Sequence, residues 1–172
     1  GAWRYLIGDT VRFTNIKKKE IIITGRTKHY ISLVGEHLSV DNMTRAVARI
    51  ARTHQIEINE FALAGIKQDG QFGHRWYLGV KGDLPEGLTT DQLAREIDAH
   101  LSELNDDYAV ERQHALKSIS VDVLPLEYFL QWMEEKGKLG SQHKFPRVIK
   151  GDMFKDWQAF LTRKGIRESV PA

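Results

Sequence analysis

The sequence predicts an α+β fold, an α/β sandwich with a ferredoxin-like βαββαβ core, an antiparallel or mixed sheet with helices packed on it, and two extra C-terminal helices. Apolar residues recur every three or four positions in some segments and every second position in others, which distinguishes helices from strands. From residue 30 onward these segments follow the βαββαβ order. The length of 172 residues, with 41% hydrophobic and 28% charged residues, is typical of one globular domain or of one domain with a short appendage.

The first 35 residues are predicted to be mainly β-structure. Residues 5–7 and 11–13 combine aromatic and β-branched side chains, as strands do. Residues 20–24 contain three consecutive isoleucines and are expected to form a well-buried strand. A further strand is predicted at residues 30–34, and Gly35 ends it.

Two amphipathic helices and a hairpin make up the rest of the core. Ser39 and Thr89 are expected to cap the helices, because their hydroxyls can accept hydrogen bonds from the first-turn N–H groups. The hairpin strands are predicted at residues 56–66 and 75–81, with a turn at 69–73. The apolar faces are expected to be Met43, Val47, Ile50 and His54 in the first helix and Leu93, Ile97, Leu101 and Leu104 in the second.

The last core strand is predicted at residues 119–123, and two further helices follow it. Pro125 suits the first turn of one helix and Asp152 the cap of the other, while Gly137 and Gly165 end them. The side chains expected to be buried are Leu126, Phe129, Leu130 and Met133 in the first and Phe154, Trp157 and Leu161 in the second.

The composition excludes several classes of protein. The chain contains no cysteine, so thiolate catalysis and disulfides are excluded, and a cytoplasmic location is expected. Its seven histidines lack the spacing of metal ligands, so no metal-binding residue is predicted. No apolar run approaches the roughly 18–20 residues that span a bilayer. A formal net charge of +2 is too balanced to indicate nucleic-acid binding.

Three segments contain residues suited to chemistry. Tyr-Leu-Ile-Gly-Asp at residues 5–9 ends a strand with a carboxylate, which can accept hydrogen bonds from both hydroxyls of a ribose. The second segment, residues 25–38, leaves the next strand with Gly-Arg-Thr-Lys and continues through a short ribbon to the loop Gly-Glu-His-Leu at residues 35–38. Gln-His-Lys-Phe-Pro-Arg at residues 142–147 places a lysine before a stiff segment, so that its ammonium can point at a phosphate or carboxylate. Taken singly, each segment is equally an ordinary turn, hairpin or connecting loop.

In this order the three segments resemble the motifs of the adenylate-forming enzymes, and within them those of the auxin-responsive acyl-acid amido synthetases. The resemblance covers essentially the whole chain but only the last third of such an enzyme. It implies that residues 1–27 are the end of the N-terminal domain with the hinge, and that residues 28–172 are a small mobile C-terminal domain. His143 departs from the pattern, in which an aromatic residue is expected.

The resemblance implies a role for individual residues. Asp9 would bind the ribose hydroxyls of ATP, Arg26 would orient the nucleotide or the hinge, and Lys28 would be the hinge position. Lys144 would be the catalytic lysine that reaches the α-phosphate and the acyl carboxylate, with Lys150 as the alternative.

The implied reaction uses ATP and Mg²⁺ to adenylate a small carboxylic acid, after which an amino-acid amine displaces AMP. The expected partners are these small carboxylic acid and amino acid substrates and the protein's own N-terminal domain, with no nucleic acid and no membrane. The loop at Gly35 would face the active site when the amine attacks. The chain is expected to be inactive alone, because most of the nucleotide site would lie upstream of Gly1.

Two alternatives remain. A stand-alone ferredoxin-like binding or regulatory module, such as an RNA-binding domain, would present exposed aromatic residues on the middle strands; Phe61 and Trp76 are the candidates, although Trp76 fits the core equally well. A thioester-forming ligase of the same superfamily would be expected to end in a Pro-x-x-x-x-Gly-Lys-type loop. Here Gly151 follows Lys150 instead of preceding it, which favours the amido synthetases.

Overall fold

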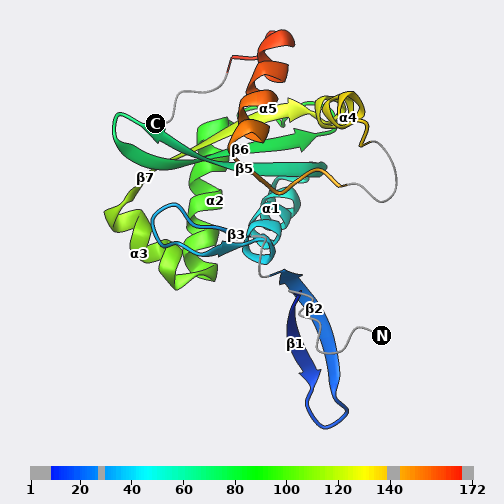
Figure 1. The fold of residues 1–172 in the computed structure, drawn as a ribbon, viewed down its shortest axis with the longest axis vertical. Helices are drawn as coiled ribbons and strands as arrows, with labels where there is room; N and C mark the ends of the chain where they lie inside the picture. The colour runs from blue at the N-terminus through cyan, green and yellow to red at the C-terminus, as the bar shows by residue number, and fades with distance from the viewer. Residues whose placement is uncertain (1–8, 27–29, 139–143, 168–172) are drawn as a thin grey trace.

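The structure is a computed structural model that describes residues 9–26, 30–138 and 144–167. Within these ranges the chain forms a mixed four-stranded sheet with helices on both faces, and a separate two-stranded ribbon that extends away from this body (Figure 1). The predicted α+β class is therefore confirmed. None of the helices in the described ranges has both the length and the apolar character needed to cross a bilayer.

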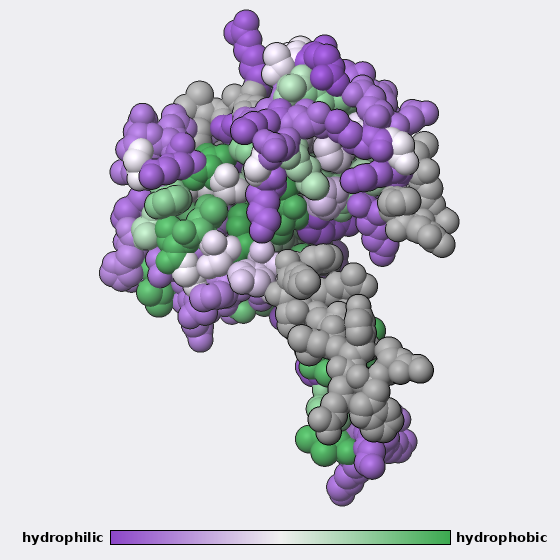
Figure 2. All heavy atoms as spheres, in the orientation of Figure 1, coloured by the Kyte–Doolittle hydropathy of each residue, from purple (hydrophilic) through white to green (hydrophobic). Residues whose placement is uncertain are grey.

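The extended ribbon consists of strands β1 (Asp9–Asn15) and β2 (Glu20–Arg26), which pair antiparallel. The three isoleucines at 21–23 are 41–68% exposed, so the expectation of a well-buried strand there is wrong. A two-stranded ribbon has two faces, and nothing in the described chain covers either of them. Figure 2 shows apolar side chains at the surface of this ribbon.

The main sheet has the strand order β7-β6-β5-β8. Strands β5 (Ile58–Gln68) and β6 (Gln71–Val80) form the predicted antiparallel hairpin. Strand β7 (Leu116–Pro125) lies parallel to β6, and β8 (Val148–Ile149) lies parallel to β5. The sheet is thus mixed, as predicted, and β8 forms the edge next to the hairpin.

The first strand of the predicted core does not join this sheet. Strand β3 (Tyr30–Ile31) pairs instead with β4 (Leu38–Ser39) in a small separate ribbon. The predicted strand over residues 30–34 stops early because the backbone N–H groups of Leu33 and Val34 donate to a side-chain carboxylate and not to a neighbouring strand. In the sheet, β8 occupies the place beside β5.

Helices α1 (Val40–His54) and α2 (Thr90–Leu104) cover one face of the sheet, as Figure 1 shows. Ser39 and Thr89 cap them, as predicted. A short helix that the sequence did not predict, α3 (Asp106–His114), follows α2. The predicted residues Met43, Val47, Ile50, Leu93, Ile97 and Leu101 are buried, and His54 and Leu104 are half-buried.

Helices α4 (Leu126–Glu135) and α5 (Asp152–Arg163) cover the opposite face. Leu130 was expected in the core but is 48% exposed, and Trp132 is buried instead because its ring packs against those of Phe145 and Trp157. Gly151, with φ of 59°, stands at the start of α5, and Asp152 makes no capping hydrogen bond there. Rings of this layer pack around Phe145 at centroid distances of 4.8–5.2 Å, namely those of Phe129, Trp132 and Trp157.

The substitution Phe145→Ala is expected to lower the free energy of unfolding by about 3–5 kcal/mol, because it leaves a cavity among three aromatic rings. Denaturant unfolding of this chain followed by circular dichroism measures the loss. Leu130→Ala, on the exposed side of the same helical layer, is the control and should cost less than about 1 kcal/mol. Equal losses in the two variants would contradict the central place of Phe145.

Candidate functional site

A groove of about 660 Å³ runs beside β8 and the start of α1. The two lysines between which the sequence did not decide, Lys144 and Lys150, both line it, together with Tyr30 and Val148. A second cavity of about 430 Å³ shares Tyr30, Val148 and Lys150 with the groove and continues toward the loop between β3 and β4. The structure therefore brings the two candidate lysines to one place.

Arg147 anchors the segment that carries Lys144 to strand β5. The Arg147 guanidinium bonds the Glu60 carboxylate, donates to the Phe61 carbonyl oxygen at 2.9 Å, and lies 4.3 Å from the centre of the Phe61 ring. The Arg147 carbonyl oxygen accepts a hydrogen bond from the Leu63 N–H at 2.9 Å. The lysine is thus exposed but attached to a fixed backbone, as the aromatic–Pro–Arg segment predicted. No pattern in the sequence predicts the structural role of Arg147.

The charges of the groove suit an anionic ligand. Lys144 and Lys150 are exposed, and no carboxylate is present among the described residues that line the groove. Ammonium groups on flexible stems pair readily with phosphate or carboxylate oxygens. A magnesium ion needs oxygen ligands, and in the described part of the chain no three His, Asp or Glu side chains lie together as a metal site requires. The groove therefore fits phosphates and carboxylates and not a bare metal ion.

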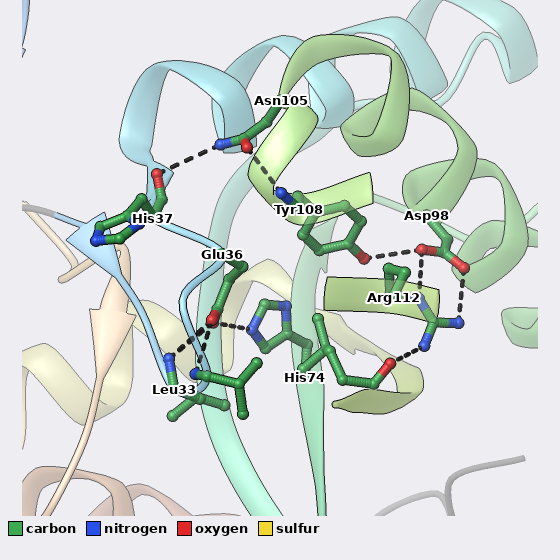
Figure 3. Close-up of polar contacts among 10 residues, drawn as sticks. Leu33, Glu36, His37, His74, Asp98, Asn105, Tyr108 and Arg112 are labelled. Carbon is green, nitrogen blue, oxygen red and sulfur yellow. Dashed lines mark hydrogen bonds and ion pairs between the residues drawn. The ribbon is translucent and has the colours of Figure 1, made fainter. Parts of the chain in front are cut away.

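The loop between β3 and β4 is held by a buried carboxylate, that of Glu36 (Figure 3). Its oxygens accept hydrogen bonds from the backbone N–H of Leu33 at 2.9 Å, from that of Val34 at 3.0 Å, and from Nε2 of His74 at 2.9 Å. Burial alone would raise the pKa of Glu36, but these hydrogen bonds outweigh it and lower the pKa from 4.5 to about 2. The carboxylate is therefore ionised at neutral pH.

His74 connects this loop to the helices on the same face of the sheet. Its ring lies 5.9 Å from that of Tyr108, whose hydroxyl donates to Asp98 at 2.9 Å. Burial raises the pKa of Tyr108 well above its usual value of 10, and the nearby Asp98 acts in the same direction. Arg112 binds both oxygens of the Asp98 carboxylate, at 2.7 and 2.8 Å. The unpredicted helix α3 thus supports the loop indirectly, through the contact of Tyr108 with His74.

Neither Glu36 nor His74 was assigned a role from the sequence. Glu36 stood in the motif around Gly35 without a function, and His74 looked like one of several histidines without metal-ligand spacing. One signal was present, namely a histidine in the apolar strand that also contains Trp76. Their partnership joins positions 38 residues apart, and no local pattern reports such a contact.

The residues predicted to bind nucleotide lie on the extended ribbon. Asp9 and Arg26 are register partners across β1 and β2, so their backbones face each other. Lys28, the predicted hinge residue, and His143 lie outside the described residues. Among the residues that the structure does describe, the candidates thus fall into two groups, Asp9 with Arg26 on the ribbon and the two lysines in the groove.

The aromatic residues that an RNA-binding module would expose are not available. Phe61 is 5% exposed and Trp76 is fully buried, with their ring centres 6.2 Å apart. Base stacking needs an accessible ring face. The two named candidates therefore serve the core of the fold.

Comparisons with known proteins agree with the resemblance of the motifs. The family model for the GH3 family C-terminal domain matches residues 41–153. A solved GH3.15 acyl acid amido synthetase shares 18% identity with a TM-score of 0.73, over 92% of this chain and 31% of that chain. AtGH3.15 acyl acid amido synthetase in complex with 2,4-DB shares 20% identity with a TM-score of 0.73, over 92% and 30% respectively. The comparison with curated proteins gave no match. The chain thus spans about a third of these solved structures and has their C-terminal domain fold.

The substitution Glu36→Gln is expected to destabilise the chain at neutral pH but not in acid. The unfolded carboxyl has a pKa of 4.5 and the folded one about 2, so the ionised group stabilises the fold above pH 4.5 and this contribution is lost as the pH falls toward 2. Urea unfolding should show a difference between wild type and variant on the order of 3 kcal/mol at pH 7 that shrinks steadily below pH 4.5.

The control for this titration is Glu86→Gln, at an exposed position. It should change the free energy of unfolding by no more than about 0.5 kcal/mol at neutral or acid pH. A Glu36→Gln difference that stays constant between neutral pH and pH 2 would show that ionisation of Glu36 does not support the loop.

Proposed function

The chain belongs to the GH3 family, as its C-terminal domain, and on this premise we propose that it is the mobile part of an ATP-dependent acyl acid amido synthetase. The observation that carries the proposal is the groove in which Lys144 extends from an anchored segment, with Lys150 beside it. The ordered motifs and the names of the similar solved structures support the same activity. The proposed reaction joins a small carboxylic acid to the amine of an amino acid.

In the first step an oxygen of the acid attacks the α-phosphorus of ATP, and the bond to pyrophosphate breaks. In the second step the amine attacks the acyl carbon, the bond to AMP breaks, and the nitrogen loses a proton. The first step brings two anions together, so an ammonium at the α-phosphate lowers its barrier. Lys144 supplies this charge from a backbone that Phe145 and Arg147 hold in place.

The remaining parts of the active site belong to an N-terminal domain. Asp9 would hold the ribose, and Arg26 and Lys28 would stand at the hinge between residues 1–27 and 28–172. The groove offers cations but no carboxylate among its described lining residues, so the ligands of Mg²⁺ would come mainly from that domain. The exposed isoleucines at 21–23 suit a ribbon that this domain covers. A cytoplasmic location, where ATP and free amino acids occur together, fits this activity.

Replacement of Lys144 by alanine in the full-length protein is expected to lower acid-dependent exchange of pyrophosphate into ATP by about 10²–10³-fold, because a charge aimed at the α-phosphate is lost. Lys150→Ala should keep exchange at saturating acid within about tenfold of wild type. Lys155→Ala, an exposed lysine on α5, is the control. Intact exchange in Lys144→Ala would refute this assignment, and its loss in Lys150→Ala alone would transfer the role to Lys150.

The existence of the N-terminal domain has its own test. An antibody against this chain should detect a native gene product with a mass well above 19.7 kDa, and that protein should release AMP when an acid and an amino acid are both supplied. A native mass near 19.7 kDa would contradict the proposed synthetase and favour a stand-alone binding module.

A further inference from the structure

We propose that the buried pair Glu36 and His74 consists of positioning residues, which fix the loop between β3 and β4 as one wall of a pocket for a small organic carboxylate. The inference rests on the proposed function, since the acyl acid and the amino acid are both carboxylates of this kind. The pocket is the cavity of about 430 Å³ that adjoins the lysine groove.

The loop is attached to the sheet at two adjacent positions. Gly65 on β5 and His74 on β6 are register partners across the hairpin. A Cβ atom added at Gly65 would lie 2.4 Å from a Cδ atom of Leu33, so the leucine occupies the space that a side chain would fill. Glu36 binds His74 next to it. The two ends of the loop are therefore attached to neighbouring positions of the same sheet.

The pocket has the lining that a small carboxylate needs. Lys150 is the charged residue among those described around it, and Ile31, Leu33 and Val148 contribute apolar side chains. An ammonium pairs with the carboxylate while apolar side chains contact the carbon skeleton. Lys144 lines the larger groove and not this pocket, which leaves the larger groove for phosphate.

Hydrogen bonds to a buried polar pair fix the orientation of the loop backbone more strictly than apolar packing does. The Glu36 carboxylate fixes the N–H groups of Leu33 and Val34 by directed hydrogen bonds, and His74 fixes the carboxylate. Both side chains are fully buried, and Nδ1 of His74 has no hydrogen-bond partner within the described part of the chain. Such burial is costly. We attribute it to the need for one defined position of Leu33 at the pocket.

The first experiment measures the loop in this chain by amide hydrogen exchange. Glu36→Gln and His74→Leu should each accelerate exchange at the Leu33 and Val34 amides at least tenfold. His74→Gln retains an amide donor toward Glu36 and should stay within threefold of wild type. His114→Gln, at an exposed position, is the control. Unchanged exchange in Glu36→Gln and His74→Leu would overturn the positioning role.

The second experiment measures kinetics in the full-length protein. In Glu36→Gln and His74→Leu the KM for one small carboxylate substrate should rise at least fivefold. The half-reaction that does not use this substrate should keep its kcat. In His74→Gln the KM should return to the wild-type value. A raised KM for the amino acid identifies the acceptor as the occupant, and a raised KM for the acyl acid identifies the donor. Unchanged KM values for both, or an equal loss of kcat in both half-reactions, would overturn the pocket.

The two proposals fail in different ways. A full-length protein that adenylates normally with unchanged KM values keeps the proposed function and loses this pocket. A protein that adenylates no acid loses the proposed function, and the pocket is then decided on this chain by titrating benzoate and glutamate against the amide resonances of Leu33 and Val34. Shifts that saturate in wild type and disappear in Lys150→Ala support the pocket, and their absence refutes it.

Discussion

The burial of Phe145 is the constraint on which the lysine groove depends. Three aromatic rings of the α4–α5 layer surround this side chain, and three residues later the chain pairs with β5 as strand β8. Residues 144–150 must therefore run along the sheet edge in one position. Lys144 and Lys150 begin and end this stretch, and both side chains line the same groove for this reason. Aromatic packing on one face of the sheet thus determines where positive charge stands at its edge.

The wall of the adjoining smaller pocket is held by a different kind of interaction. In the loop between β3 and β4, Leu33 packs over Gly65, and the Glu36 carboxylate holds the loop through hydrogen bonds from Leu33, Val34 and His74. Hydrogen bonds to an ionised group are directional and strong where water is excluded. The low pKa of Glu36 shows that the folded loop supplies more stabilisation to the charge than burial removes. Aromatic packing thus fixes the segment that carries the lysines, whereas the loop also needs the hydrogen bonds of an ionised carboxylate.

Periodic features of this fold could be predicted from the sequence, and short or long-range features could not. The helical spacing of Met43, Val47 and Ile50 depends only on local geometry, and these residues are buried as predicted. Strand β8 has two residues, too few for any pattern, and its pairing with β5 depends on Phe145 and Arg147. The run of isoleucines at 21–23 is a true strand, but burial requires a covering layer, which the described chain does not supply.

The same distinction between local and long-range features applies to the residues of the candidate site. Lys144 could be selected because an ordered set of motifs surrounds it in the sequence, whereas Glu36 and His74 act through a contact that only the folded chain creates. From the sequence, Lys144 and Lys150 were alternative candidates for the catalytic lysine. Their positions favour two different roles. Both lysines line the groove, but of the two only Lys150 also lines the second pocket. In the proposed two-step reaction, one cation can pair with the α-phosphate and another with a substrate carboxylate. On the proposed function, one anchored segment supplies both.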